Sequence, residues 1–426
     1  MFGMKIWLIT FSLFLMHSLS TPLHADSLFE SVVSGDVDGE VRSVLYMRSA
    51  GGRSDDGISY LAKASGLAVG GHIGYTTKPF HHITARLAGY TTQALSGDGN
   101  TLAKSNLVNG EEDYTILGEA YFQYDDSINK LKIGRQGMQT PLVYSDDARV
   151  IKDLFSGVTL SSKLLDNHTF HLFYLDRMSG MDNGHEKKQW VSMSEVLGAS
   201  YERGMTAVGV QNSSFENLNT QLWYYDVPDT IKMIFTDVKY KNKVSENLSL
   251  TYEAHYWKSR SKSAYENDTS SIIDYYFAGA RISAEIDKFT LQLAYDHMGK
   301  EAGTKTIHEY YGNFAEYTYG FLLGSGAYGA ELAPINPNNM TSMDALKATV
   351  QYHYNKDTHL YSGYMMATSD DKNYQSDVNI LDIALFMSNV GHKDVSLALI
   401  YENWDSDGNN FFIDNNLLRT TVKFKF

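Results

Sequence analysis

Apolar and polar side chains alternate with a period of two along most of the chain, and no stretch of helix length has a convincing period near 3.6. At 345–354, for example, Leu346, Val350 and Tyr352 fall on one face and Lys347 falls on the other. Segments of ~9–12 residues with this pattern have the length of a tilted transmembrane β-strand. We predict eighteen strands, at 41–48, 66–76, 80–90, 113–124, 128–136, 157–164, 168–176, 197–212, 218–226, 231–241, 247–258, 273–285, 289–298, 344–354, 358–368, 378–390, 394–403 and 416–426.

The connections between these segments are alternately short and long, which separates a membrane barrel from a soluble β-sandwich. Long polar insertions lie at 49–65, 91–112, 137–156, 177–195, 259–272, 299–343 and 404–415, and tight turns lie between them. Tight turns on one rim and long loops on the other are typical of an outer-membrane barrel, in which every backbone group must be paired. An even number of antiparallel strands brings both termini to the periplasmic rim. We therefore interpret 197–212 as one long strand, although Arg203-Gly204 is also compatible with a turn.

Both ends of the chain support export to the outer membrane. A short apolar stretch follows Lys5 and ends in small residues before Asp26, which predicts a signal peptide at 1–25 and a single barrel domain at 26–426. A membrane anchor is the competing interpretation, but no charged stop-transfer segment follows. The last strand ends in Phe426 and resembles the targeting signal of bacterial outer-membrane barrels.

Composition narrows the function classes. The chain has 30 Tyr, 20 Phe, 34 Gly and only 6 Pro in 426 residues, which suits half-buried strands joined by turns. It contains no Cys, so a disulfide framework, a thiol nucleophile and a thiolate metal site are excluded. The formal net charge of -14 argues against a nucleic acid partner, since phosphate binding needs a basic surface.

The faces opposite the apolar ones should line the lumen, and they carry several cations in spite of the acidic composition. Such groups on a wall would attract carboxylates or phosphates and pass them along. The alternative is that interior acids such as Glu40, Glu119 or Glu253 neutralise them. The cations expected in the substrate pathway are Arg42, Arg86, Arg135, Lys163, Arg281, Lys347, Arg419 and Lys423.

The insertion at 137–156 is rich in apolar residues, so we expect it to fold back into the barrel as its third long loop and to narrow the lumen. The stretch IGRQGMQTPLVYSDDARVIKDLFSGV at 133–158 resembles the third loop of the OprD-type family of substrate-specific outer-membrane porins. The segments DVDGEVRSVLYMRS at 36–49 and LQLAYDHMG at 291–299 also look like parts of that family.

This resemblance implies an eighteen-stranded barrel, a monomer or a homotrimer, that is surrounded by outer-membrane lipid. Diffusion through such a channel does no chemistry, so we expect no cofactor. It implies passive uptake of small anionic or zwitterionic solutes with carboxylates, such as amino acids, peptides or organic acids. Arg135 would stand on the wall beside the constriction, and the loop side would carry Tyr144, Ser145, Asp146, Asp147 and Arg149. The chain departs from the family at 152–157, where the family often has a Pro and an acidic residue.

Other function classes remain open at this stage. A general non-selective porin has the same architecture, and the long insertion at 299–343 would suit an adhesive or structural barrel, or a lid over the pore mouth. An enzymatic barrel is the third alternative, but eighteen strands leave an aqueous channel and no catalytic constellation is visible. Asp405, Asp407 and Asn409 form a weak calcium candidate, because no Glu stands at the twelfth position of that loop.

Overall fold

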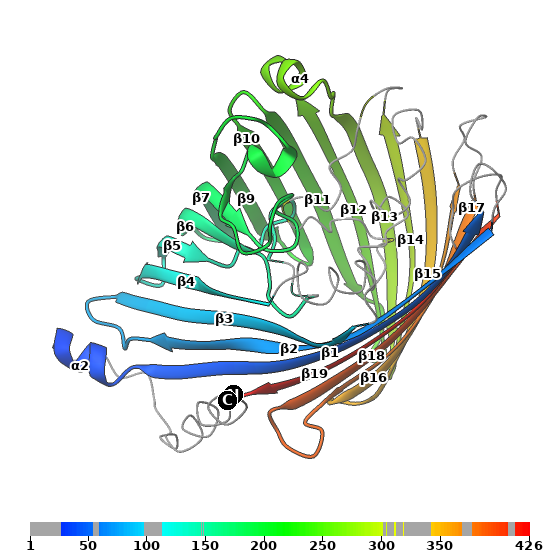
Figure 1. Ribbon diagram of the computed structural model, residues 1–426, viewed down its shortest axis with the longest axis horizontal. Helices are drawn as coiled ribbons and strands as arrows, with labels where there is room; N and C mark the ends of the chain where they lie inside the picture. Colours follow the sequence, from blue (N-terminus) through cyan, green and yellow to red (C-terminus); the bar gives the residue numbers. More distant parts are fainter. Residues whose placement is uncertain are drawn as a thin grey trace.

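The computed structural model shows one antiparallel sheet that closes on itself (Figure 1). The structure describes residues 27–53, 59–97, 113–145, 147, 149–300, 304, 311, 318, 342–368, 377–407 and 414–426. Each long strand pairs with the next long strand in the sequence, and β1 pairs with β19 as well as with β2. The predicted signal peptide at 1–25 lies outside the described residues.

Eighteen long strands build the wall, as predicted, and β8 is a two-residue addition from an extracellular loop. Among the described residues, two short α-helices, α2 (Leu28–Val33) and α4 (Ser263–Thr269), lie outside the sheet. No helix in this part of the chain is long and apolar enough to cross a membrane. The strands are β1 (Asp36–Arg53), β2 (Ser59–Thr76), β3 (Ile83–Gly97), β4 (Tyr114–Asp125), β5 (Asn129–Gln136), β6 (Leu154–Leu165), β7 (His168–Ser179), β8 (Val191–Ser192), β9 (Met205–Phe215), β10 (Leu218–Val227), β11 (Ile231–Lys243), β12 (Leu248–Ser261), β13 (Asp274–Ile286), β14 (Phe289–Lys300), β15 (Ser342–Asn355), β16 (Thr358–Thr368), β17 (Asp377–Ser388), β18 (Val395–Asp407) and β19 (Asp414–Lys425).

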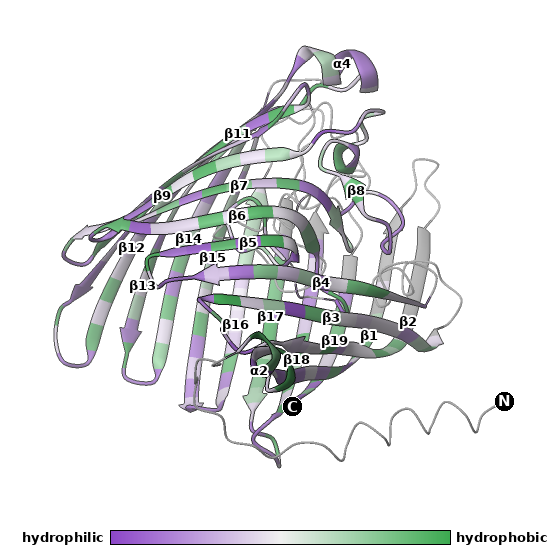
Figure 2. Cartoon of the chain, turned by 90° about the vertical axis from the view of Figure 1, so that its left-hand side faces the viewer, coloured by the Kyte–Doolittle hydropathy of each residue, from purple (hydrophilic) through white to green (hydrophobic). Residues whose placement is uncertain are grey.

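The period of two in the sequence becomes an apolar outer face and a polar inner face. Tyr295 on β14 lies directly opposite Leu346 on β15, and both project outward. Lys347, one residue further, projects inward and is buried. Figure 2 shows the same alternation of hydrophilic and hydrophobic residues along the strands of the wall. Because lipid offers no hydrogen-bond partners, a β-sheet can span the membrane only when it closes on itself and turns its apolar face outward.

The C-terminus helps to close the barrel. The backbone N–H of Gly39 donates to the carbonyl of Phe426 at 2.9 Å, and the N–H of Phe426 donates to Gly39 at 3.0 Å. Tight turns join the strands at this periplasmic rim, and Asn167 and Asp287 adopt positive φ angles of 62° and 50° in two of them. Asn and Asp tolerate this backbone region better than other residues with a Cβ. The last strand, β19, therefore pairs with the first strand, β1, and this pairing closes the ring.

Several predicted boundaries differ from the structure; β1, for example, runs from Asp36 to Arg53 and not from 41 to 48, and two further differences change the loops. Strand β9 begins at Met205, so 197–204 does not belong to one long strand as we had expected. Ser194 closes this segment into a compact loop instead, because its backbone N–H donates to the Arg203 carbonyl and its Oγ accepts from the Arg203 N–H at 2.7 Å. Strand β6 begins at Leu154, so the loop before it ends at Asp153 and not at 156. Neither correction changes the number of long strands.

Candidate functional site

The loop between β5 and β6, residues 137–153, lies inside the barrel and is called the constriction loop below. Its side chains Leu142, Val143 and Val150 are almost fully buried, and they belong to the same apolar cluster as wall residues of β1, β9 and β10. The backbone N–H of Leu142 lies 3.4 Å from the Tyr225 hydroxyl of β10. Burial of these apolar side chains explains why the loop leaves the aqueous rim and packs against the inner wall.

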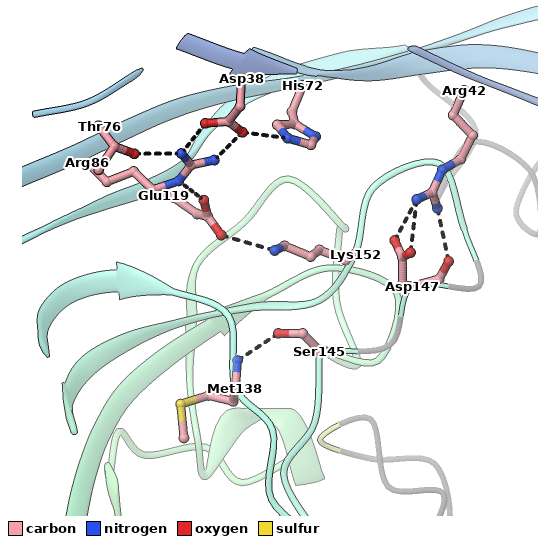
Figure 3. A network of polar contacts seen from close by, with 10 residues as sticks. All are labelled: Asp38, Arg42, His72, Thr76, Arg86, Glu119, Met138, Ser145, Asp147 and Lys152. Atoms are coloured by element: carbon pink, nitrogen blue, oxygen red, sulfur yellow. Dashed lines mark hydrogen bonds and ion pairs between the residues drawn. The ribbon is translucent and has the colours of Figure 1, made fainter. Parts of the chain in front are cut away.

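One side of the constriction loop is attached to the wall where the barrel closes. Arg42 of β1 donates from Nη2 to both carboxylate oxygens of Asp147, at 2.8 and 2.9 Å. Lys423 of β19 donates to the same carboxylate at 3.0 Å. Arg42 also donates to the carbonyls of Asp147 and Arg149, as Figure 3 shows for Asp147. We call Arg42, Asp147 and Lys423 the Asp147 cluster; it joins the loop to both strands at the seam.

The charge state of Asp147 follows from these contacts. Burial alone would raise the pKa of its carboxyl, but the facing charges of Arg42 and Lys423 outweigh that effect and hold the pKa below its ordinary value of 3.8. Arg42 is itself only 4% exposed and donates from Nε to Glu40 at 2.8 Å. At neutral pH the Asp147 cluster is therefore ionised, with Arg42 buried and the Asp147 carboxylate still 48% exposed to the lumen.

A second cluster holds the other end of the loop, and we call Asp38, Arg86, Glu119 and Lys152 the Glu119 cluster (Figure 3). Lys152 of the constriction loop donates to Glu119 of β4 at 3.0 Å. Arg86 of β3 donates to the other oxygen of Glu119 at 2.6 Å and to Asp38 of β1 at 2.9 Å. Ion pairs at Asp147 and Lys152 therefore fix the later part of the loop, on either side of Val150, to the inner wall.

The remaining predicted loop residues have structural roles. The Ser145 hydroxyl accepts a hydrogen bond from the Met138 backbone N–H at 2.9 Å and folds the loop into a tight turn. Tyr144 donates its backbone N–H to the Tyr311 carbonyl at 3.0 Å, and the Tyr311 hydroxyl donates to Met193. Asp146 lies outside the described residues.

Most of the predicted wall cations face the lumen, but five of them are neutralised by acids. Besides Arg42, Arg86 and Lys423, Arg281 donates to Glu253 at 2.7 Å, and Lys347 forms a buried ion pair with Asp382. The acids that we expected as neutralising partners do form these ion pairs: Glu40 binds Arg42, Glu119 binds Arg86 and Glu253 binds Arg281. Arg419 lies on the inward face of β19, and Lys163 lies inward and exposed near the periplasmic end of β6. Five of the eight predicted cations therefore belong to structural ion pairs, and Lys163 is exposed to the lumen.

Arg135 is on the wrong face for the role we predicted. It pairs in register with Ala120, and on the same strands Ile133 pairs with Phe122. Ile133 and Phe122 are exposed apolar residues of the outer face, and the alternation of side chains places Arg135 with them. Its guanidinium packs over the Trp190 ring, 4.6 Å from the centroid, and donates to the Leu117 carbonyl at 3.0 Å. Arg135 is an outer-face residue near the extracellular rim and does not line the lumen.

Lysines that we had not selected occupy the inner face of the same strand. Lys130 and Lys132 alternate with the outward Leu131 and Ile133, and both line a cavity of about 170 Å³ together with Gln136 and Thr159. The period of two in this strand already places Lys130 and Lys132 on the face opposite Leu131 and Ile133, although our prediction named Arg135. We call Lys130, Lys132 and Lys163 the lysine row.

An amide-rich wall lies beside the lysine row. A second cavity of about 320 Å³ is lined by side chains of β7, β9, β10 and β11, including Asn212, Gln211 and Gln221. Gln221 donates to Asp237 at 2.7 Å, and His171 lies 3.3 Å from Gln211. The lumen below the constriction loop thus has a cationic side and a largely neutral polar side.

The calcium candidate stays a prediction. Asp405 and Asp407 belong to β18, and Asn409 lies outside the described residues. Within the described ranges, no group of three or more His, Asp or Glu side chains is arranged to hold a metal ion.

Comparison with known proteins decides the family. The model of the OprD family of outer membrane porins matches residues 62–323. The chain belongs to the OprD family. It is therefore an outer-membrane channel of bacteria and not an enzyme. No curated protein matches the chain.

Solved structures agree with this OprD-family fold at low sequence identity. OpdK from Pseudomonas aeruginosa has 15% identity and a TM-score of 0.68, with 92% of this chain and 99% of OpdK covered. OpdK has also been solved with vanillate, at a TM-score of 0.69, 15% identity and 92% and 98% coverage. OccAB4 from Acinetobacter baumannii has 13% identity and a TM-score of 0.69, with 92% and 98% covered.

The corrected position of Arg135 leads to a direct test in this OprD-family channel. Arg135→Ala is expected to leave the reversal potential in a salt gradient equal to that of the wild type, because the side chain lies outside the lumen. Lys132→Ala on the inner face of the same strand serves as the comparison and should shift the reversal potential toward cations. Planar-bilayer recordings of both variants check this. A shift for Arg135→Ala as large as that for Lys132→Ala would contradict the assignment of faces.

Proposed function

We propose that this OprD-family protein is a passive channel for small solutes that carry a carboxylate, and that the lysine row guides them below the constriction loop. The observation that carries the proposal is the alignment of Lys130, Lys132 and Lys163 on the inner face of two paired strands. Guanidinium and ammonium groups on a pore wall lower the energy of an anion in transit without binding it irreversibly.

The lysines of this row are less neutralised by neighbouring acids than the paired cations elsewhere on the inner wall. Lys132 and Lys163 form no ion pair within the described residues, and the partner of Lys130 is an exposed Asp125 carboxylate at 3.3 Å. The ammonium group of Lys132 lies over the Tyr121 ring, 4.7 Å from the centroid, which keeps it on the wall. A small carboxylate can therefore meet these lysines without first displacing a buried acid.

Hydroxyl and amide groups complete the surroundings of the row. Lys130 pairs in register with Ser161, and Lys132 pairs with Thr159, so each lysine has a hydroxyl beside it. The amide-rich wall beyond it can bind the uncharged part of a solute by hydrogen bonds. The structure of OpdK with vanillate, an aromatic carboxylate, supports this solute class for the family fold. The solute would leave toward the periplasm past Lys163, down its gradient.

The test is current block by vanillate in planar bilayers, with vanillin as the probe that lacks the carboxylate. Vanillate should block the wild-type channel, and the variant Lys130→Gln/Lys132→Gln/Lys163→Gln should need at least about tenfold more vanillate, since each nearby unit charge contributes on the order of 1 kcal/mol even in water. Vanillin should block both proteins weakly and equally.

A matched control removes three exposed lysines from the periplasmic turns, Lys288→Gln/Lys356→Gln/Lys393→Gln, and should behave like the wild type. Equal block by vanillate and vanillin, or an unchanged block in the lysine-row variant, would instead indicate a general non-selective porin.

A further inference from the structure

A group of cations lies on the outer, lipid-side face at the extracellular ends of β11 and β12, where the channel function does not use them. Lys232, Lys258 and Arg260 have the same parity along their strands as the outward Ile234 and Tyr256. We call these three residues the outer basic patch. Lys258 is 44% exposed and Arg260 is 60% exposed, so their charged groups are accessible from outside the barrel.

The arrangement of the patch leaves positive charge unbalanced. Lys232 and Arg260 pair in register on adjacent strands, and like charges in this relation repel each other. Lys258 and Arg260 share one carboxylate, Asp274 of β13, at 3.4 Å each. Asp226, the register partner of Lys232, is bound to Lys262 at 2.7 Å. The three cations of the patch and Lys262 therefore share two carboxylates, those of Asp226 and Asp274.

Tyrosines mark the depth of the patch in the membrane. Tyr224, Tyr256 and Tyr276 project outward from β10, β12 and β13, and the rings of Tyr256 and Tyr276 are stacked with centroids 6.1 Å apart. Such aromatic girdles lie at the membrane–water interface. Lys258 pairs in register with Tyr276, and Arg260 lies two residues further toward the extracellular end of β12. The outer basic patch is therefore level with the headgroups of the outer leaflet.

We infer that the outer basic patch binds the phosphate groups of a phosphorylated glycolipid in the outer leaflet. Arg260 can donate two parallel hydrogen bonds to a phosphate, and the two lysines add point charges on either side of it. An anion placed between Lys232 and Arg260 would remove their mutual repulsion. The tyrosine girdle below them would contact the upper part of the acyl chains.

The experiment measures binding of lipid A to the purified full-length protein in detergent by native mass spectrometry. Diphosphorylated lipid A is compared with lipid A whose phosphates have been removed. The wild type should retain the diphosphorylated form, and Lys232→Gln/Lys258→Gln/Arg260→Gln should bind it at least about tenfold more weakly, because each interfacial cation contributes about 1 kcal/mol. Neither protein should retain the dephosphorylated form.

The periplasmic control Lys288→Gln/Lys356→Gln/Lys393→Gln loses the same number of charges and should bind as the wild type does. Heat-modifiability on gels shows that each variant is folded, and vanillate block should be unchanged in the patch variant, which separates this inference from the proposed function. Equal retention of both lipid A forms, or unchanged binding by the patch variant, would overturn it. Full displacement by millimolar inorganic phosphate would assign the patch to free anions and would also overturn it.

Discussion

Asp147→Asn is expected to raise single-channel conductance and to increase anion selectivity at pH 7. The substitution keeps the shape of the side chain but removes the charge that Arg42 and Lys423 share. The loss of stability is expected to be small, because the Asp147 side chain is 48% exposed and screened by water, and because Arg42 keeps Glu40. The loop would then be held mainly by the Glu119 cluster, and two wall cations would face the lumen without their shared counter-charge. Recordings of conductance and reversal potential in planar bilayers measure both effects.

Asp176→Asn provides the control, because Asp176 is an acid of similar exposure, 52%, whose ion pair is with its neighbour Arg177 and not with Arg42 or Lys423. A double-mutant cycle with Arg42→Gln then isolates the coupling between Arg42 and Asp147. If Asp147→Asn and Asp176→Asn give the same conductance as the wild type, the Asp147 cluster does not hold the constriction loop.

The pKa of Asp147 predicts the pH dependence of the same property. Its carboxyl has a pKa below 3.8 in the folded protein, so it stays ionised in the folded protein at all pH values well above 4. The stabilisation from the Asp147 cluster is present above the ordinary carboxyl pKa and is lost as the pH falls through the lowered one. We therefore expect the part of anion selectivity that depends on Asp147 to be constant between pH 7 and pH 5. If the wild type at pH 5 already has the selectivity of Asp147→Asn, the ionised state assigned to Asp147 is wrong.

Alternation along the chain was sufficient to predict the barrel because each strand meets lipid on one side and water or polar groups on the other. The same signal would have placed Arg135 correctly, since Leu131 and Ile133 mark the outer face of β5. The segment 197–204 resembles a strand in sequence for another reason. Its apolar residues Leu197 and Ala199 are buried within a folded extracellular loop, so they imitate part of a strand pattern without facing lipid.

The contacts that hold the constriction loop could not be predicted from a single sequence. Asp147 is 105 residues from Arg42 and 276 residues from Lys423 along the chain, and only closure of the barrel brings the three together. The inward fold of the loop was predictable from its apolar composition, but its ion-pair partners depend on the register of β1 against β19. The opposite-face lysines of β5 were visible as a pattern, whereas the ion pair of Lys130 with Asp125, and the lack of one at Lys132 among the described residues, were not.

The buried pair of Lys347 and Asp382 should control the stability of the barrel. Lys347 on β15 reaches over β16 to Asp382 on β17, and the side chains are 1% and 0% exposed. The strand between them has Gly363 at this point, where an added Cβ would come within 2.9 Å of the Lys347 side chain. The absence of a side chain at Gly363 lets the ammonium group cross one strand and meet its carboxylate.

Asp382→Ala is therefore expected to destabilise the folded barrel by roughly 3–5 kcal/mol, because it leaves a dehydrated ammonium group without its counter-charge. The temperature at which the compact, heat-modifiable form disappears on gels measures the loss, and denaturant unfolding in lipid gives the free energy. The double variant Lys347→Met/Asp382→Leu should recover most of the stability, since an apolar pair of similar size avoids the dehydration cost of both charges. A single variant as stable as the wild type would show that Lys347 finds another partner, and a double variant less stable than Asp382→Ala would show that the site requires the charged pair itself.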